Sequence, residues 1–256
     1  MNTNSNTYTV LYSAILVIVV AVVLAFAAIS LKPAQEKNIK EETVGQILKA
    51  ASIDIEDNNV LATYSNNIVA AIYVNGNGEV MDSLKTDIKN IQVNTTSDLK
   101  KQTKEKDLSK MHLPVYIFNN GITVVPCYGA GLWGPIWGYI GFDKDLNTIT
   151  KAVFDHKSET PGLGAKIAEQ PFQSQFPGKK VGNDEKLFGV VKAGNETNDS
   201  EVNAITGATI TSTAVGTTLN QWFGFYKAYF TAAAVEIEAE AVETETEVED
   251  TNKVEE

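Results

Sequence analysis

The first pattern along the chain is an uncharged and almost wholly apolar run at residues 10–31. At about 1.5 Å per residue, this run predicts roughly 33 Å of helix, enough to cross the hydrocarbon core of a membrane once. A cleaved signal peptide is the alternative, since small residues at 25–28 resemble a cleavage site. The segment before the run lacks lysine and arginine, and the run exceeds the usual signal-peptide core of about 7–15 residues. The sequence therefore favours a retained anchor.

Behind this anchor, the polar and apolar positions predict a short linker and one domain. Residues 1–9 form a short N-terminal segment, residues 32–42 have the composition of a polar linker, and residues 43–235 carry the periodic patterns of a folded domain. Residues 83–111 are lysine-rich and weakly patterned, so they predict no element. Thr43 begins an amphipathic helix with one apolar face, formed by Val44, Ile47, Leu48 and Ala51.

The middle of the domain has the patterns of β-strands. Residues 68–74 are an apolar run, and the Asn-Gly-Asn-Gly sequence after them is typical of a turn. Two further runs at 115–118 and 122–125 flank an Asn-Asn-Gly turn, which predicts a hairpin. Additional strands are predicted at 137–143, 147–155 and 187–191.

The last apolar repeat predicts a helix that begins near residue 211, with a face formed by Val215, Leu219, Trp222, Phe223, Tyr226 and Phe230. Thr211 or Ser212 is a candidate N-cap. The free N–H groups and the positive dipole end of this helix would face the turn at 206–209, which makes a seat for phosphate. In that turn, Gly207 can adopt a positive φ and Ala208 leaves room for a ligand. The alternative is a capped helix start without a ligand.

Two glycine-containing loops are further candidates for a site. Residues 128–136 combine glycines with Trp133, and either the tryptophan fills the core or the glycines let a planar ring approach. Residues 156–166 contain Pro161-Gly162, the pair that a type II turn prefers, and Gly164 keeps the loop open. A tight turn without any ligand is the alternative for the second loop.

Charge is distributed unevenly. The net charge is −11, but residues 236–256 hold ten acids and one lysine, a net of −9, which leaves about −2 for the rest. This acidic tail is expected to be disordered. No basic face indicates nucleic acid as a partner. All 21 basic residues are lysine, so no guanidinium is available to bind phosphate, and an anion would need N–H groups, hydroxyls, lysines or a covalent bond.

Cysteine and histidine are too sparse for a metal centre. The chain contains Cys127, His112 and His156, which are far apart in the sequence. A single cysteine also excludes an intrachain disulfide. We therefore expect no zinc or iron–sulfur site.

Three short motifs, in one order along the chain, resemble one flavoprotein family. Thr206-Gly207-Ala208-Thr209 resembles the S/T-G-A-T flavinylation motif of the C subunit of the Na+-translocating NADH:quinone reductase and of its relative, the G subunit of the RNF electron-transport complex. The E-T-P-G-L-G sequence at 159–164 resembles the second signature of the family, and the Y-G-A-G-L-W sequence at 128–133 resembles a segment characteristic of the C subunit. The resemblance covers about residues 1–230. The fold it implies is α+β: a single transmembrane helix followed by an FMN-binding domain with an antiparallel sheet and flanking helices.

The resemblance implies covalent FMN, joined to Thr209 through a phosphoester. Spacing alone does not choose Thr209 over Thr206, Thr211 or Thr213. The family also implies that Thr160 and Leu163 lie against the flavin and that Glu159 and Lys166 tune it. The remaining cofactor-binding candidates carried over from the motifs are Trp133, Gly164, Thr206, Gly207, Ala208, Ile210 and Thr211. One departure is Asn203, where the family usually has aspartate three residues before the S/T, so recognition by the attaching enzyme is in question.

The family implies a function as the FMN-carrying subunit that relays electrons within a Na+-pumping NADH:quinone oxidoreductase. The implied partners are other subunits of the complex, a flavin transferase and the lipid bilayer of the bacterial inner membrane. The resemblance places the domain in the periplasm, whereas Lys32, Lys37 and Lys40 after the anchor favour the cytoplasm. No G-x-G-x-x-G joins a predicted strand to a predicted helix, so NADH would be oxidised on another subunit. The alternatives are the RNF subunit and an anchored scaffold without flavin.

Overall fold

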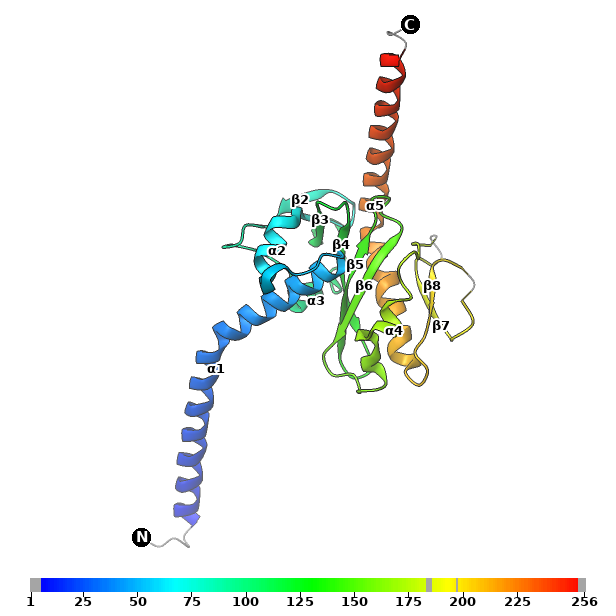
Figure 1. The fold of residues 1–256 in the computed structure, drawn as a ribbon. Helices are drawn as coiled ribbons and strands as arrows, with labels where there is room; N and C mark the ends of the chain where they lie inside the picture. Colours follow the sequence, from blue (N-terminus) through cyan, green and yellow to red (C-terminus); the bar gives the residue numbers. More distant parts are fainter. Residues whose placement is uncertain (1–5, 183–185, 197, 253–256) are drawn as a thin grey trace. The chain divides into compact units, whose positions relative to one another are not determined.

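The computed structural model describes residues 6–182, 186–196 and 198–252. Two compact units are present, Met1–Glu42 and Thr43–Glu256 (Figure 1). Helix α1, Asn6–Ala50, runs through the described part of the first unit and ends in the second. It is the one helix among the described residues that is long and apolar enough to cross a membrane.

The structure differs from the predicted linker at residues 32–42. These residues continue α1 without a break, and the separate helix predicted to begin at Thr43 is its last part. Lysine and glutamate favour helix, and Lys32–Glu36 is an i,i+4 ion pair with 3.8 Å between the charged atoms. Lys37–Glu41 is a second such pair. A polar composition therefore does not interrupt the helix here.

The second unit is built on a six-stranded sheet in which all neighbouring strands are antiparallel. The antiparallel α+β fold expected from the sequence is confirmed, and each predicted strand before residue 156 has its counterpart. The first edge strand was not predicted, because its four residues are all exposed and show no alternation. In spatial order the strands are β2 (Val80–Ser83), β1 (Ile68–Val74), β3 (Leu113–Phe118), β4 (Thr123–Ala130), β5 (Pro135–Phe142) and β6 (Ile149–His156).

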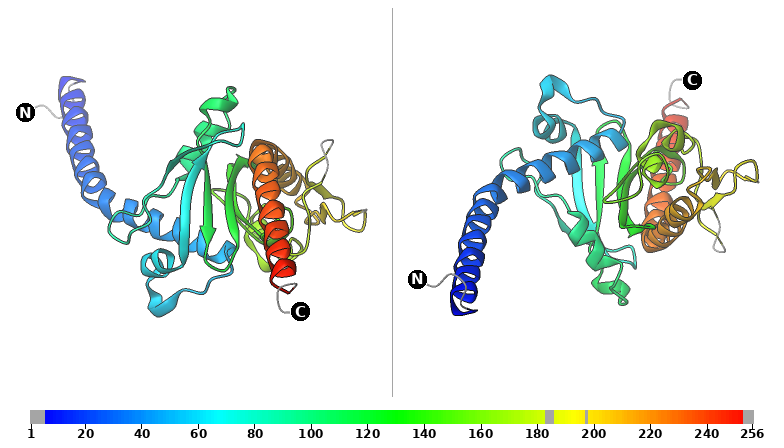
Figure 2. Two further views of the ribbon diagram at one scale, coloured as in Figure 1. Left: turned by 90° about the horizontal axis from the view of Figure 1, so that it is seen from above. Right: turned by 90° about the horizontal axis from the view of Figure 1, so that it is seen from below.

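Both faces of this sheet are covered, because successive strand residues point to opposite sides. Val125 and Ile140 belong to a cluster with the apolar face of helix α5, Thr209–Asn252. Their neighbours Val124 and Tyr139 belong to a second cluster with the last turns of α1. Figure 2 shows these two helical segments on opposite faces of the sheet. The sheet is thus the middle layer of three.

A second, smaller sheet lies beyond α5. It pairs β7 (Gly189–Val191) in parallel with β8 (Glu201–Asn203), and α5 contacts both β7 and β4 (Figure 2). The strand predicted at 187–191 is therefore two residues shorter at its start. Strand β8 was not predicted, since three residues of mixed polarity carry no periodic signal. It leads directly into the turn before α5.

The remaining helices are short. None of them was predicted from the sequence, and α3 and η2 fall in the lysine-rich segment for which the sequence predicted no element. A capping box explains α3, because the Thr95 N–H donates to Asp98 Oδ2 at 3.1 Å. The helices are η1 (Glu56–Asn58), α2 (Val60–Asn67), α3 (Thr96–Gln102), η2 (Leu108–Lys110), η3 (Gly164–Ala168) and α4 (Gln170–Gln173).

The structure also differs from the disordered tail expected at residues 236–256. Helix α5 continues through this segment to Asn252, and the last four residues lie outside the described part of the chain. The segment alternates glutamate with alanine and other residues, and both glutamate and alanine have high helix propensity. Acidic composition alone therefore does not distinguish a disordered tail from a helical one.

Candidate functional site

The N-terminus of α5 has no side-chain cap. The helix begins at Thr209, two residues before the predicted start, and Ala208 occupies the N-cap position because the Ser212 N–H donates to its carbonyl oxygen at 3.0 Å. Ser212 is not the cap: its hydroxyl accepts the Ile205 N–H and donates to the Ala208 carbonyl. The first N–H groups of a helix have no acceptor within the helix, and alanine supplies none. This end of α5 can therefore donate hydrogen bonds to a ligand.

The turn before the helix explains the Gly207-Ala208 pair. The Ala208 N–H donates to the Ile205 carbonyl at 3.0 Å, and Gly207 has φ +81°. Glycine adopts this left-handed conformation at no steric cost. The expectation of a positive φ at Gly207 is confirmed, and the turn delivers the chain to the first residue of α5.

The 159–164 loop is the tight turn that its sequence predicts. The Leu163 N–H donates to the Thr160 carbonyl at 3.1 Å, with Pro161 and Gly162 between them, and Gly162 has φ +76°. This is the pattern of a type II turn. The turn brings the Leu163 side chain towards α5, where its Cδ2 lies 3.5 Å from the position of a Cβ on Gly207.

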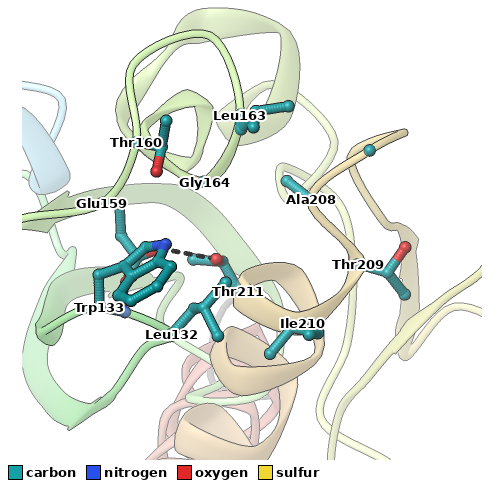
Figure 3. A pocket seen from close by; sticks show the side chains of 11 residues that line it. Leu132, Trp133, Glu159, Thr160, Leu163, Gly164, Ala208, Thr209, Ile210 and Thr211 are labelled. Atoms are coloured by element: carbon teal, nitrogen blue, oxygen red, sulfur yellow. Dashed lines mark hydrogen bonds between the residues drawn. The ribbon is translucent and has the colours of Figure 1, made fainter.

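The Glu159 carboxylate joins three segments at this site. It is only 4% exposed. Its Oε1 accepts the backbone N–H of Trp133 at 2.8 Å, and its Oε2 accepts the hydroxyl of Thr211 at 2.8 Å (Figure 3). A buried carboxylate is stable only when its oxygens are satisfied, and both oxygens are satisfied here.

The loop glycines make room for protein atoms. A Cβ on Gly131 or on Gly164 would collide with the Glu159 carboxylate, and one on Gly134 would collide with the hydroxyl of Ser158. The sequence suggested that glycines in 128–136 let a planar ring approach and that Gly164 keeps its loop open. In the structure these glycines instead allow Glu159 and Ser158 to pack inside the loops.

A cavity of about 300 Å³ lies where the three segments meet. Ten of the residues predicted from the sequence line it, together with Leu132, which the sequence analysis missed although it lies next to Trp133 in the same loop. Lys166 and Thr206 are not among the lining residues. The ten are Trp133, Glu159, Thr160, Leu163, Gly164, Gly207, Ala208, Thr209, Ile210 and Thr211.

The four threonines that the sequence left open differ in their surroundings. Thr211 is 1% exposed and its hydroxyl is bound to Glu159. Thr206 and Thr213 are exposed but do not line the cavity. Thr209 is exposed, lines the cavity and projects from the first turn of α5 on the side away from Trp133 (Figure 3).

Large apolar side chains surround the cavity and are exposed. Trp133 is 68% exposed and Ile210 is 64% exposed, and Leu132 and Leu163 are also exposed. Such a cluster is uncommon on the surface of a monomeric protein and marks a binding surface. The question left by the sequence for Trp133 is thereby answered: this tryptophan does not fill the core.

Asn203 has partners that explain an amide at this position. Its Oδ1 accepts the Gly194 N–H at 2.7 Å, and its side chain also hydrogen-bonds Glu196, which holds the pKa of the Glu196 carboxyl below its usual value. An aspartate here would place a second carboxylate against Glu196, which is unfavourable. The amide therefore has a local structural role, independent of any attaching enzyme.

Cys127 and the histidines have ordinary surroundings. Cys127 is buried, and burial raises the pKa of its thiol to about 12. The Glu159 backbone N–H donates to Nδ1 of His156 at 3.3 Å. Among the described residues, no three metal-binding side chains form a group.

The comparisons with known proteins agree with this geometry. Residues 131–224, which include Trp133, the 159–164 loop and the first turn of α5, match the family model of the FMN-binding domain. The C subunit of the Na(+)-translocating NADH-quinone reductase of Haemophilus ducreyi is 30% identical, over 91% of this chain and 97% of its own length. The same subunit of Neisseria meningitidis serogroup B is 28% identical, over 81% and 85%.

A solved structure is similar as well. The C subunit of the Na(+)-translocating NADH-quinone reductase of Parabacteroides distasonis superposes with a TM-score of 0.65 and 34% identity, over 78% of this chain and 97% of that structure. The relative of Haemophilus ducreyi thus covers 91% of this chain, and the Parabacteroides distasonis structure covers 78%. The chain therefore belongs to the family of the C subunits of the Na(+)-translocating NADH-quinone reductases.

Proposed function

We propose that this chain is the membrane-anchored subunit that holds FMN through a phosphoester at Thr209 and relays electrons within a Na+-pumping NADH:quinone oxidoreductase. The flavoprotein character follows from the FMN-binding domain and the family. The covalent bond, the anchor and the attaching transferase are the parts that we add.

The observation that carries the proposal is the position of Thr209. It is the first residue of an uncapped helix, it is exposed, and it lines the cavity. A phosphate at its Oγ1 would lie at the positive end of the helix dipole, within reach of free N–H groups. Because the chain has no arginine, no guanidinium can hold this anion, and the free N–H groups together with a covalent bond would hold it at this helix end.

The rest of the cavity has the chemistry that a flavin ring needs. Its volume of about 300 Å³ is at the lower end for ligand sites, roughly 300–1,000 Å³, which suits one planar ring system with its side chain along the surface. The exposed apolar side chains of Trp133, Leu163 and Ile210 would be covered by such a ring. Burial of this surface from water favours binding.

When bound, FMN supplies the ability to accept electron pairs and to release electrons singly. The chain itself would bind and orient the cofactor. Thr209 would fix the phosphate end, the apolar side chains would exclude water from the ring, and the Thr160 hydroxyl is placed at the cavity as a hydrogen-bonding group. A tether at the phosphate leaves the ring electronically unmodified.

The anchor is proposed to be α1. Its residues 10–31 are uncharged and exposed along their length. With a periplasmic domain, a cysteine introduced at exposed Lys157 should react with a membrane-impermeant maleimide once only the outer membrane is permeabilised. The native Cys127 is buried and should not react with the maleimide. Labelling that required disruption of the inner membrane would place the domain in the cytoplasm, as the lysines after the anchor favour.

The proposal is tested by in-gel flavin fluorescence of the denatured full chain, expressed with a flavin transferase. We expect a fluorescent wild-type band, a dark Thr209→Ala band and fluorescent Thr206→Ala and Thr213→Ala bands. A dark wild-type band would contradict covalent attachment and would favour an anchored scaffold. Fluorescence retained in Thr209→Ala would move the attachment to another residue.

A further inference from the structure

Glu159 lies where the segments of the site meet, but its side chain is buried beneath them. Figure 3 shows this side chain passing behind the Trp133 ring. A buried side chain of this kind has little surface to offer a ligand. Its contacts to the protein therefore indicate what it does.

Those contacts join two walls of the cavity. Oε1 accepts the Trp133 N–H and Oε2 accepts the Thr211 hydroxyl, each at 2.8 Å. The bonds span 26 and 52 residues of sequence, so they fix segments that the local chain does not hold together. Both Trp133 and Thr211 line the cavity.

The surrounding backbone leaves space for this carboxylate and little else. Gly131 and Gly164 come so close that a Cβ on either would collide with it. The Trp133 loop has a second tie, because the Ser158 hydroxyl donates to the Trp133 carbonyl at 3.0 Å. Position 159 thus combines a close-packed environment with two charge-assisted hydrogen bonds, which are the stronger kind.

We propose that Glu159 is a positioning residue: it holds the Trp133 loop and the first turn of α5 together, and so preforms the cavity before any cofactor is present. Through Thr211 it also fixes the turn that exposes Thr209, two residues earlier. This second consequence rests on the proposed attachment at Thr209, whereas the first does not. In this role Glu159 acts through Trp133 and Thr211.

Substitutions at position 159 can separate the hydrogen bonds of Glu159 from its charge. In Glu159→Gln, the amide oxygen can accept the Trp133 N–H and the amide nitrogen can donate to the Thr211 hydroxyl. Both ties therefore remain available without the charge. Glu159→Ala removes both, and Glu169→Gln is a matched control, since Glu169 is exposed and has no described side-chain cap bond.

The first readout is hydrogen exchange of the Trp133 backbone amide in the full chain without flavin, followed by mass spectrometry with fragmentation. Loss of a hydrogen bond to a charged group should speed exchange about 10- to 100-fold in Glu159→Ala. Glu159→Gln and Glu169→Gln should exchange close to wild type. Unchanged exchange in the β4–β5 pairs would show that each variant is folded.

Two results would overturn the proposal in this experiment. One is a Trp133 amide that exchanges at the wild-type rate in Glu159→Ala. The other is a Glu159→Gln variant that exchanges as fast as the alanine variant, because its amide retains both contacts. Neither result depends on whether flavin is attached.

The second readout is the rate of flavin attachment with the transferase. Glu159→Ala should be labelled more slowly than wild type, and Glu159→Gln should recover the rate. Equal rates in all variants, with fast exchange in the alanine variant, would overturn the consequence for Thr209. A wild type that stays dark would contradict the attachment at Thr209 and leave the exchange experiment to decide the role of Glu159.

Discussion

The first two residues of α5 and the part of the helix around Trp222 differ in exposure and in hydrogen bonding. At the first turn, Thr209 and Ile210 are exposed and the N–H groups lack a cap. Four turns later, Trp222 is fully buried and its Nε1 donates to the Tyr128 carbonyl at 2.7 Å, and the Tyr226 hydroxyl donates to the Pro114 carbonyl at 2.8 Å. The same helix thus has an exposed N-terminus and a buried, hydrogen-bonded middle part.

The contrast shows how a binding site can be exposed to a ligand while the helix that carries it is held in place by packing. A ligand needs unsatisfied donors and exposed apolar surface, both of which destabilise a protein that has no ligand. Here the aromatic packing of the middle part holds the helix axis, with Phe142 and Phe223 in edge contact at 5.5 Å between ring centroids. A rigid element that carries a binding group positions it better than a loop does.

The largest expected effect is the loss of stability when a residue in the buried part of α5 is substituted. Trp222→Ala should lower the free energy of unfolding by about 3–5 kcal/mol, because it removes a fully buried indole and its hydrogen bond. Trp133→Ala removes the same side chain from an exposed position and should change stability by less than about 0.5 kcal/mol. Thermal unfolding followed by circular dichroism, on the full chain in detergent, checks both. Equal losses would contradict the contrast between the packed part of α5 and the exposed site.

The next effect separates two threonines of the first turn. Thr211→Val should cost about 1–3 kcal/mol of stability, because one oxygen of buried Glu159 loses its donor. Thr209→Val should cost little, because its hydroxyl is exposed. Attachment of flavin should respond in the opposite order: it should be lost in Thr209→Val and only slowed in Thr211→Val, which breaks the bond to Glu159 but keeps the Thr209 hydroxyl. Denaturant titration gives the stability of each variant, and in-gel fluorescence of the same samples gives its flavin attachment. If one variant lost both more stability and more flavin than the other, the two threonines would not have separate roles.

The smallest effect concerns the missing cap. Ala208→Ser supplies a hydroxyl for an N–H of the first turn and should stabilise the flavin-free chain by about 0.5–1 kcal/mol. The same hydroxyl would compete with a phosphate for that N–H, so attachment of flavin should slow. Ala214→Ser, within the helix, is the control for adding a hydroxyl. A serine variant that is both more stable and attached at the wild-type rate would mean that the free N–H groups are not used.

The sequence predicted the fold well where periodicity was strong. The apolar run at 10–31, the strand at 68–74 and the apolar face of α5 all appear as expected. Short elements without a pattern, such as β2 and β8, were missed. The linker at 32–42 was misassigned because polar composition was taken as a break, although its i,i+4 ion pairs favour helix.

The sequence motifs grouped residues that the structure brings to one cavity, but they did not indicate the contacts between them. The motifs named ten of the cavity residues, since each motif lies at one loop or helix end. The start of α5 was placed near 211 from the apolar repeat, with Thr211 and Ser212 as candidate caps, whereas the helix begins directly after Ala208, which carries no capping signal. The role of Glu159 depends on contacts across the fold, and no local pattern reports them.

The attachment of FMN to Thr209 is tested most directly by peptide mass mapping. Cleavage after lysine isolates residues 193–227, which hold Thr206, Thr209, Thr211 and Thr213 together, from a chain expressed with the transferase. Fragmentation should assign the mass of FMN, less one water, to Thr209. The same mass on any of the other three threonines, or an unmodified peptide in a flavin-loaded preparation, would contradict the account.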